Sequence, residues 1–550
     1  MNQFSKSFSK QPVLIVSAVL IFLALLAYVG YFAVYLNFAI KLFQFPFDYD
    51  QGEGFELLDT IMLMNGEWPY RNSNEYPFYA SNYPPVYHLF IIPLVAIFGP
   101  QYWTGRLVSF LSTLITAGVL GYAVYREQKI KRWWLVSLSA LMYFASNYVY
   151  HIGPLFRQHI FMIMFEAAAV VLMAIIIDKE EADGRKRPWW IVGVLFLLLL
   201  AGFTKQLAYA TVAALFIWWF LRDIKRSVIW AIGFAAVTGA VFLAINISTE
   251  NQWWINTIAA NLNEFFPAQA IGLYKQWFQL HRMITLVAAG YVVYQLYFER
   301  FSIYSVWFVL TVANSVTAGT WGAGESYFVT AIAASIILAG LGFSRLLDTF
   351  ETEQPEWAQK LPFKPYHALM ILIPLLFIWQ ANLVFHMPTG SAFTQTLARL
   401  AGRPTVTYVA PQTSCSDDLP AEPLPYVDDA FVLIGRPPTP EDTAAGKQIV
   451  AEILKGETAA FSEEAGFNIY AGREVITNPT QLRNLYLAGL LDMTEMVKML
   501  EEQAFDTVIF RAQFYPPEVL QAIGQYYQQE ELIQMNGFVY CIYRPDPSES

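Results

Sequence analysis

Charged residues are scarce in this chain. Asp, Glu, Lys and Arg make up 14% of its 550 residues, against about 25% in ordinary soluble domains. So few charges cannot cover the surface of a soluble protein of this length, and 56% of the residues are hydrophobic. The composition therefore excludes a purely soluble protein. It indicates a polytopic α-helical membrane protein with a soluble part attached.

Several familiar site patterns are missing as well. The sequence has no P-loop glycine pattern, which leaves nucleotide-driven transport without support. No spacing of His, Cys and Asp is typical of a zinc site. The two cysteines, Cys415 and Cys541, both lie near the C-terminal end. They form one disulfide if they meet outside the cell, and the sequence leaves that pairing open.

Apolar runs long enough to cross a bilayer recur along residues 1–389. The first, 13–36, exceeds the core of a cleaved signal peptide and follows Lys6 and Lys10. We therefore expect an uncleaved span that starts in the cytoplasm. We predict about eleven spans, since each run approaches the roughly 17–25 apolar residues that a bilayer requires. The runs are 13–36, 103–125, 133–149, 159–177, 189–203, 205–220, 228–247, 282–298, 302–319, 326–342 and 367–386.

Basic residues set the expected orientation. Lys and Arg cluster in four segments, at 126–132, 185–187, 222–226 and, more thinly, 345–364. The positive-inside rule places all four in the cytoplasm. Eleven spans satisfy this rule if the run 85–99, which contains Pro93, is a re-entrant or interfacial helix that does not cross. Twelve or thirteen spans are the alternative.

Residues 390–550 differ in character from the rest. They contain 10 Lys and Arg against 22 Asp and Glu, a net charge of −12, whereas residues 1–389 have +2. An acidic tail of this kind argues against nucleic-acid binding. Strand-like and helix-like patterns alternate in it. Strands are expected at 430–435, 505–510 and 537–544, and helices at 440–456 and 478–503. We predict an extracytoplasmic soluble α/β domain that serves as a structural or acceptor-recruiting lid.

The loop after the first span holds a dense set of carboxylates. Residues 45–84 contain seven acidic side chains, one basic side chain and ten aromatic ones. An anionic lipid surface repels carboxylates, and their desolvation is costly. Their density beside a bilayer therefore requires a reason, and acid–base chemistry is one. The acids are Asp48, Asp50, Glu53, Glu56, Asp59, Glu67 and Glu75.

Short motifs follow this loop in a fixed order. They read DYDQGEG at 48–54, NG at 65–66, NYPPVYHLF at 82–90, GPQYWTGRLVS at 99–109, TKQ at 204–206 and ESYF at 325–328. Together with the many spans, this ordered set resembles the GT-C class of membrane glycosyltransferases. That class includes the protein O-mannosyltransferases of glycosyltransferase family 39 and the aminoarabinose transferases of lipid A.

The resemblance implies a GT-C fold and an enzyme of the cell inner or plasma membrane whose active site is extracytoplasmic. Such enzymes move a sugar, here a hexose or pentose, from a polyprenyl-phosphate donor to a glycan, lipid or protein acceptor. A carboxylate takes the acceptor's proton and the configuration inverts, while the leaving phosphate needs cationic or hydrogen-bonding partners. We expect the catalytic domain at 1–389, with its acidic loop at 37–84, and the soluble domain at 390–550.

Asp50 is the expected general base. It lies just past the first span beside two glycines, which allow close approach of a substrate. The competing interpretation is that Asp50 caps the helix that follows, and Asp48 is the rival base. Glu53 takes the role of second carboxylate, because this chain has Gln51 where many relatives have Glu.

Lys205 is the expected phosphate partner. A lysine between two apolar runs needs an anion or must extend to the interface. Arg106 is the second candidate, since a guanidinium binds phosphate bidentately, although an anchor at a helix end suits it equally. Further substrate-binding candidates come from the other motifs, each with an ordinary structural role as its competitor. They are Tyr83, His88, Arg157, His159, Glu325 and Tyr327.

Two other functions stay open at the level of sequence. A transporter or flippase of lipid-linked saccharides requires paired intramembrane charges and often internal repeats, and we find few such charges and no repeat. The second function is that of a glycan-binding protein without catalytic activity. Gln51 stands where related enzymes have a carboxylate, which is consistent with a loss of catalysis. A divalent metal also stays open, because the loop supplies carboxylates without a diagnostic spacing.

Overall fold

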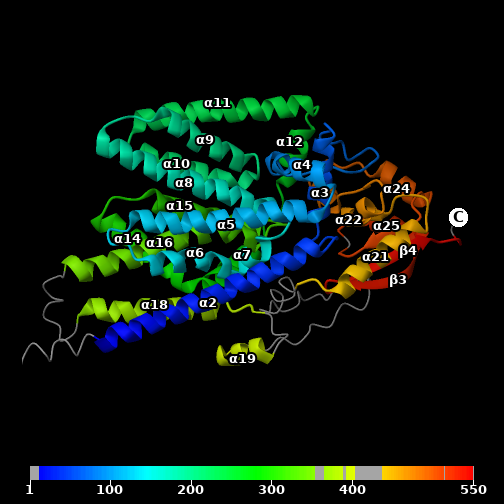
Figure 1. Cartoon of the computed structure of the whole chain (residues 1–550). Coiled ribbons are helices and arrows are strands. Elements are labelled where there is room, and N and C mark those ends of the chain that lie inside the picture. The colour runs from blue at the N-terminus through cyan, green and yellow to red at the C-terminus, as the bar shows by residue number, and fades with distance from the viewer. Residues whose placement is uncertain (1–10, 354–363, 388–391, 403–436, 513, 549–550) are drawn as a thin grey trace, which may run out of the picture.

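The structure, a computed structural model, describes residues 11–353, 364–387, 392–402, 437–512 and 514–548. Figure 1 shows a long helical bundle with the C-terminal elements gathered at one end. Six helices are long and apolar enough to cross a membrane, as expected of an integral membrane protein. They are α2 (Gln11–Gln44), α5 (Tyr102–Glu127), α8 (Gln158–Asp183), α11 (Ile224–Ser248), α16 (Val329–Asp348) and α18 (Pro365–Leu383).

Shorter helices complete the bundle. Each of the eleven predicted runs overlaps a helix, while the number that crosses the membrane stays a prediction. The predicted loop 37–84 is wrong at its start, because α2 continues to Gln44. The shorter helices are α6 (Trp133–Ala145), α7 (Asn147–Ile152), α9 (Pro188–Gly202), α10 (Tyr209–Phe220), α13 (Pro267–Leu280), α14 (Arg282–Phe298) and α15 (Ile303–Asn314).

The run 85–99 forms helix α4 (Val86–Phe98), which contains Pro93. Figure 1 shows α4 beside α3 (Glu53–Met64) and α12 (Gln252–Thr257), at the end of the bundle that faces the C-terminal elements. The loop after α2 therefore folds into helices that lie across this end.

Side chains of α2 satisfy the backbone of its neighbour α18. Pro374 lies inside α18 and cannot donate to the carbonyl group of Met370. The Ser17 hydroxyl donates to that carbonyl instead, at 2.8 Å. The hydroxyl groups of Tyr28 and Tyr31 donate to two further α18 carbonyls at 3.0 and 2.6 Å. Such bonds matter in an apolar environment, where an unpaired carbonyl is costly.

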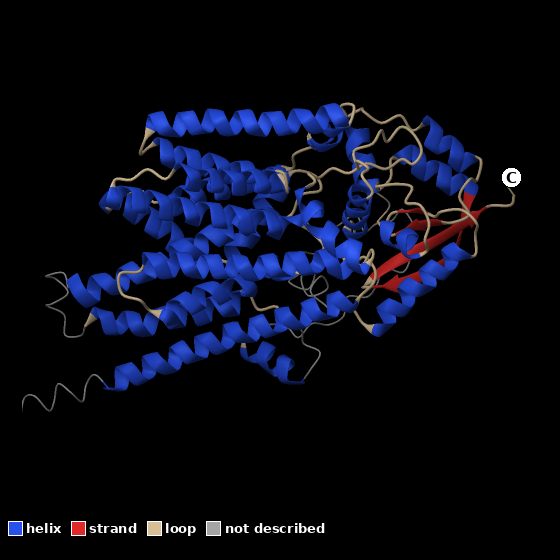
Figure 2. Ribbon diagram, turned by 45° about the horizontal axis from the view of Figure 1, so that its top comes forward, coloured by secondary structure: helices blue, strands red, loops and turns tan. Residues whose placement is uncertain are grey.

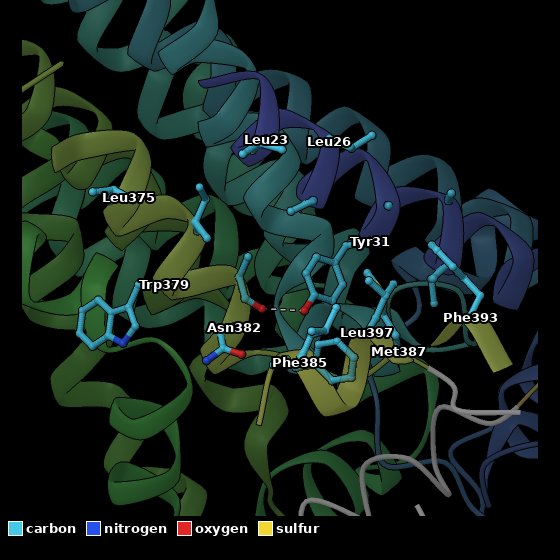
Figure 3. A pocket seen from close by; sticks show the side chains of 18 residues that line it. Leu23, Leu26, Tyr31, Leu375, Trp379, Asn382, Phe385, Met387, Phe393 and Leu397 are labelled. Atoms are coloured by element: carbon cyan, nitrogen blue, oxygen red, sulfur yellow. Dashed lines mark hydrogen bonds between the residues drawn. The ribbon is translucent and has the colours of Figure 1, made fainter. Parts of the chain in front are cut away.

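An apolar groove of about 970 Å³ runs between α2, α18 and α19 (Ala392–Leu400), as Figure 3 shows. Leu26, Trp379 and Phe393 are among its lining side chains. Among the described residues, no Asp, Glu, Lys, Arg or His lines it.

The C-terminal elements form a four-stranded sheet in the order β1-β2-β4-β3, drawn in red in Figure 2. β1 (Phe461–Ser462) is parallel to β2 (Val508–Phe510), with Phe461 opposite Val508. β4 (Phe538–Pro545) is antiparallel to both β2 and β3 (Tyr527–Met535). Asn536 and Gly537 both have positive φ, which is typical of the tight turn that joins two such strands.

Five helices accompany the sheet: α21 (Pro440–Leu454), α22 (Ala465–Tyr470), α23 (Pro479–Leu487), α24 (Thr494–Glu501) and α25 (Pro517–Tyr526). Thr439 and Asp442 form a capping box at the start of α21. The expected helix 478–503 is wrong as a single element. It is interrupted after α23, where Gly489 adopts φ 67°.

Strands β2 and β4 lie where strands are expected, whereas the expected strand 430–435 lies outside the described residues. We do not predict β3 from the sequence, because its residues, YQQEELIQM, are mostly polar. Cys541 in β4 is disulfide-bonded, and residue 415 lies outside the described part of the chain.

Close approach of two glycines joins the C-terminal elements to the acidic loop. A Cβ atom on Gly466 would meet the Tyr102 hydroxyl and the Asp48 carboxylate, and one on Gly54 would lie 2.7 Å from the Gly466 nitrogen. At the tip of the β3–β4 hairpin, the Asn536 amide donates to the Asp48 carbonyl at 3.3 Å. α22 therefore docks on α3 with no space for a methyl group.

We predict that Gly466→Ala lowers the thermal unfolding midpoint of the detergent-purified protein. The added methyl group overpacks this contact, at a cost of about 1–3 kcal/mol. Gly524→Ala is the matched control, because Gly524 also lies in a helix but has nothing within 4 Å of its Cβ position. That change is expected to stabilise by about 0.5–1 kcal/mol. An unchanged or higher midpoint for Gly466→Ala contradicts the docking.

Candidate functional site

A left-handed turn leads from the acidic loop into α3. Gly52 precedes the helix with φ 104°, a conformation that favours glycine. A Cβ atom there would also lie 2.8 Å from the Arg157 guanidinium, so two constraints require glycine. α3 then places Glu53, Glu56 and Asp59 at three-residue intervals, which puts neighbouring carboxylates on adjoining turns of the helix. All three side chains are buried.

Glu53 and Arg106 form a completely enclosed ion pair. Arg106 Nη2 lies 2.7 Å and Nε 3.0 Å from the Glu53 carboxylate, and neither side chain is exposed. The carboxylate also accepts from the backbone N–H groups of Tyr49 and Phe156. The remaining guanidinium hydrogens go to three carbonyl groups, those of Leu42, Phe45 and Phe47.

Every donor and acceptor of this pair is therefore used. From the sequence motifs we expect Glu53 to be a second catalytic carboxylate and Arg106 to be a phosphate ligand. In this arrangement neither side chain keeps a free polar atom. The pair instead holds the end of α2, the start of α3 and the start of α8 together around α5. A buried pair of this kind is costly to break.

Asp48 caps α3. Its Oδ1 atom accepts from the backbone N–H of Gly54 at 2.5 Å, and Oδ2 accepts from the Tyr102 hydroxyl at 2.7 Å. Burial raises the pKa of Asp48 above its ordinary value, and the Glu53 carboxylate adds to this rise. Capping of the helix is the alternative to catalysis that we consider for Asp50. In the structure Asp48 caps this helix instead.

Asp50 is the most accessible of the carboxylates around the start of α3. Its side chain is 37% exposed, and Oδ2 accepts from Arg157 Nε at 2.9 Å and Nη2 at 2.7 Å. Partial burial alone would raise the pKa of Asp50. The Arg157 guanidinium and His151 outweigh it and hold that pKa below its ordinary value. Asp50 is therefore an accessible, ionised carboxylate at neutral pH.

Lys205 is a buried cation in the turn that follows α9, with only 3% of its surface exposed. Its Nζ atom lies 3.4 Å from His159 Nδ1, and 4.6 and 5.5 Å from the ring centres of Tyr83 and Tyr327. Among the described residues, no carboxylate forms an ion pair with it. Burial lowers the pKa of Lys205 to about 7, and Arg157 adds to the effect.

A cavity of about 260 Å³ lies beside these groups. Glu56, Asp59, Tyr83 and Arg157 line it from the acidic loop, the start of α4 and the start of α8. Burial raises the pKa of Glu56 to about 8 and that of Asp59 to about 7. The cavity therefore combines one strong cation with two carboxylic groups whose charge is costly to maintain.

The C-terminal elements close the opposite wall of this cavity. Asn478 and Phe514 line it, and Phe514 meets Trp321 edge-on with ring centres 6.2 Å apart. The loop that carries Phe514 is held by Glu463, whose carboxylate accepts from three backbone N–H groups at 2.5–2.7 Å, those of Arg511, Ala512 and Phe514. Two parts of the chain distant in sequence therefore build one site.

Several residues singled out in the sequence lie together in this site. The cluster around Lys205 contains His159, Tyr83 and Tyr327, and the Asp50–Arg157 pair adjoins it. Their roles in binding substrate stay predictions. Glu325 borders the Asp50–Arg157 pair through His151, whereas His88 lies elsewhere. Glu325 pairs with His151 at 3.2 Å, and His88 is buried behind α3 and does not line the cavity.

Sequence reasoning did not single out Glu56, Asp59, His151, Trp321 or Phe514. Glu56 and Asp59 carry a usable signal, since they follow Glu53 at three-residue spacing on a predictable helix. His151 has a weaker signal, as a polar residue at the end of a predicted apolar run. Trp321 and Phe514 have none, because only folding brings them to the cavity.

We predict that Glu53→Gln strongly destabilises the detergent-purified protein and that Asp50→Asn does not. The first change leaves the Arg106 guanidinium buried without its counter-charge, which costs about 3–5 kcal/mol. The second removes one partner of a partly exposed pair, which costs about 1 kcal/mol or less. Thermal unfolding midpoints compare the two, and equally small shifts would contradict the structural role of Glu53.

Comparison with solved structures finds the same architecture elsewhere. ArnT from Cupriavidus metallidurans in the apo state is 13% identical, with a TM-score of 0.56 over 94% of this chain and 97% of that chain. The same protein bound to undecaprenyl phosphate is 14% identical, with a TM-score of 0.54 over 95% and 98%. An Archaeoglobus fulgidus oligosaccharyltransferase tethered with an acceptor peptide is 11% identical, with a TM-score of 0.55 over 95% and 74%.

No protein-family model matches the sequence, and no curated protein matches it either. At such low identities the likeness of the structures concerns the fold. It confirms at that level the resemblance carried by the ordered motifs: the chain has the fold of the GT-C membrane glycosyltransferases.

Proposed function

We propose that this chain is an integral-membrane glycosyltransferase that moves a hexose or pentose from a polyprenyl-phosphate donor to an acceptor. Two solved proteins of the same fold support the substrate class, since one is bound to undecaprenyl phosphate and the other is tethered with an acceptor peptide. The observation in this chain that carries the proposal is Lys205. It is a buried cation that none of the described carboxylates pairs with, and a phosphate would supply the missing charge.

The proposed topology has eleven crossings, with the four basic segments in the cytoplasm. The connections from α8 to α9 and from α10 to α11 lie at the end of the bundle away from the sheet (Figure 1). The acidic loop and the sheet lie at the other end, which we assign to the extracytoplasmic side. The catalytic domain is then 1–389 and the soluble domain 390–550.

The donor phosphate is placed between Lys205 and Arg157. Both side chains border Tyr83, which lines the cavity together with Arg157. A cation pair of this kind stabilises the charge that develops on a phosphate leaving group, and it needs no proton donor. The aromatic faces of Tyr83 and Tyr327 exclude water from Lys205 and so strengthen its attraction for the anion.

Asp50 is the proposed general base. The acceptor hydroxyl oxygen attacks the anomeric carbon, the carbon–oxygen bond to the phosphate breaks, and the polyprenyl phosphate leaves with the bonding electrons. The hydroxyl proton becomes acidic as the new bond forms, so a carboxylate of low pKa is basic enough to accept it. Arg157 keeps Asp50 ionised and fixes its position. A single displacement without a covalent intermediate inverts the configuration.

The acceptor is proposed to enter against the wall that the C-terminal elements supply. Phe514, Asn478 and Trp321 form that wall, and an aromatic surface with an amide suits a sugar or peptide equally. The acceptor class is accordingly a glycan, a lipid or a protein.

We predict that Asp50→Asn lowers the transfer rate by about 10²–10⁴-fold, the usual contribution of a positioned base. The assay follows label from radiolabelled polyprenyl-phosphate hexoses and pentoses into a membrane extract of the source organism. Glu67→Gln is the control, since Glu67 belongs to the same loop but is 53% exposed and pairs only with Arg71. If Asp50→Asn transfers sugar as fast as the wild type, Asp50 is not the base.

We predict that Lys205→Met weakens the binding of undecaprenyl phosphate by at least about tenfold, as expected for loss of a desolvated charge pair. Lys41→Met is the control, because Lys41 is an exposed lysine at the same end of the bundle. Binding is measured by quenching of tryptophan fluorescence in detergent. If both variants bind undecaprenyl phosphate with equal affinity, Lys205 does not bind the phosphate.

The binding should also depend on pH. Because the pKa of free Lys205 is lowered to about 7, the protonated form that attracts phosphate is lost as the pH rises above 7. Wild-type affinity should therefore fall between pH 7 and 9. Lys205→Arg keeps its charge throughout this range, so its affinity should fall less than that of the wild type, by only the part that ionisation of Glu56 and Asp59 contributes. A parallel fall in both proteins would contradict this assignment.

A further inference from the structure

Behind the cavity, three potential metal ligands converge from α3 and α4. The atoms Glu56 Oε2, Asp59 Oδ2 and His88 Nε2 all lie within 4.8 Å of one another. His88 Nε2 is 3.4 Å from Glu56 Oε2 and 3.7 Å from Asp59 Oδ2. All three residues are at most 2% exposed. Carboxylates and an imidazole buried so close together need an explanation.

Two of these atoms lack a hydrogen-bond partner among the described residues. Glu56 Oε2 and His88 Nε2 are both buried and unpartnered. Arg157 approaches the other oxygen of Glu56, at 3.8 Å. The Gln158 amide lies near this carboxylate, and its polar atoms likewise have no hydrogen-bond partner among the described residues. A buried polar atom without a partner costs about 1–3 kcal/mol. Here two such atoms face each other, so the expected missing component is one that both can bind.

Thr60 fixes which nitrogen of His88 carries the proton. The Thr60 hydroxyl donates its single hydrogen to the Glu56 carbonyl at 2.8 Å. Its oxygen can therefore only accept from His88 Nδ1, which lies 3.2 Å away. The neutral ring then has its hydrogen on Nδ1 and a bare lone pair on Nε2. That lone pair faces two carboxylate oxygens, which is repulsive unless a cation or proton lies between them.

We propose that Glu56, Asp59 and His88 bind a divalent transition-metal ion of the Zn²⁺ or Mn²⁺ class. Bonds of about 2.0–2.2 Å in tetrahedral geometry separate neighbouring ligand atoms by about 3.3–3.6 Å, close to the two distances from His88. One nitrogen and two oxygens favour these ions over Mg²⁺ and Ca²⁺, which prefer oxygen alone. A second partner on the far nitrogen, here Thr60, is the usual device for orienting a metal-bound histidine.

The ion would keep a coordination position open to the cavity. Glu56 and Asp59 line that cavity, whereas His88 does not. An ion on this wall could therefore accept an oxygen ligand from whatever occupies the cavity. This inference does not rest on the proposed function, because the binding of the ion is measured with no substrate present.

The test uses the full-length protein purified in detergent without a metal-affinity step and stripped with EDTA. Zn²⁺ or Mn²⁺ is added, unbound ion is removed by gel filtration, and retained metal is measured by mass spectrometry. We expect about one ion per chain and a rise in the unfolding midpoint on adding it. Mg²⁺ and Ca²⁺ at the same concentration should be retained poorly.

Metal retention by single-residue variants identifies the ligands of the ion. Glu56→Gln, Asp59→Asn and His88→Gln should each weaken binding by more than about 100-fold, and Thr60→Val, which loses only the orienting partner, by about 10–100-fold. His386→Gln should retain the ion. His386 is also buried with an unpartnered Nε2, but no described carboxylate forms an ion pair with it.

Wild-type protein that retains no ion overturns the proposal, and the three groups then share protons only. Equal retention by the three ligand variants overturns it as well. If a variant does not fold, Co²⁺ added to the wild type decides the question. A site with fewer than six ligands gives intense visible d–d absorption that Zn²⁺ abolishes, and absence of that band counts against the site.

Discussion

The enclosed ion pair between Glu53 and Arg106 is the interaction on which the rest of the site depends. It links the end of α2, the start of α3, α5 and the start of α8 through a saturated set of hydrogen bonds. Such a pair contributes little net stability when compared with apolar packing. Its effect is positional, because it fixes where α3 begins and hence which way the remaining carboxylates of the acidic loop are directed.

The other charges of the loop divide into distinct environments as a result. Asp48 caps α3 through its carboxylate, whereas Asp50 stays accessible and ionised beside Arg157. Glu56 and Asp59 are buried one and two turns further along, against His88. A single helix start therefore separates a structural carboxylate, the accessible carboxylate proposed as the base and a candidate pair of metal ligands, and the C-terminal elements close the space between them.

Much of the fold could be predicted from the sequence. Long apolar runs located the helices because crossing a bilayer demands length and hydrophobicity, which are local properties. The charge density of the loop 45–84 predicted a candidate site there, and the carboxylates of this loop do adjoin a cavity. The separate roles of the carboxylates in this loop could not be predicted. They depend on the ion pair with Arg106, which belongs to a later helix. The wall formed by Phe514 and Trp321, and the polar strand β3, likewise depend on contacts between distant segments.

We propose that Lys205 and Arg157 together hold the phosphate of a lipid donor. The most direct test is an electron cryo-microscopy structure of the protein in nanodiscs with undecaprenyl phosphate added. We expect phosphate density within hydrogen-bonding distance of Lys205 Nζ and the Arg157 guanidinium, with the Asp50 carboxylate facing the space beside it. Phosphate density elsewhere, with Lys205 still enclosed by Tyr83 and Tyr327, would contradict it.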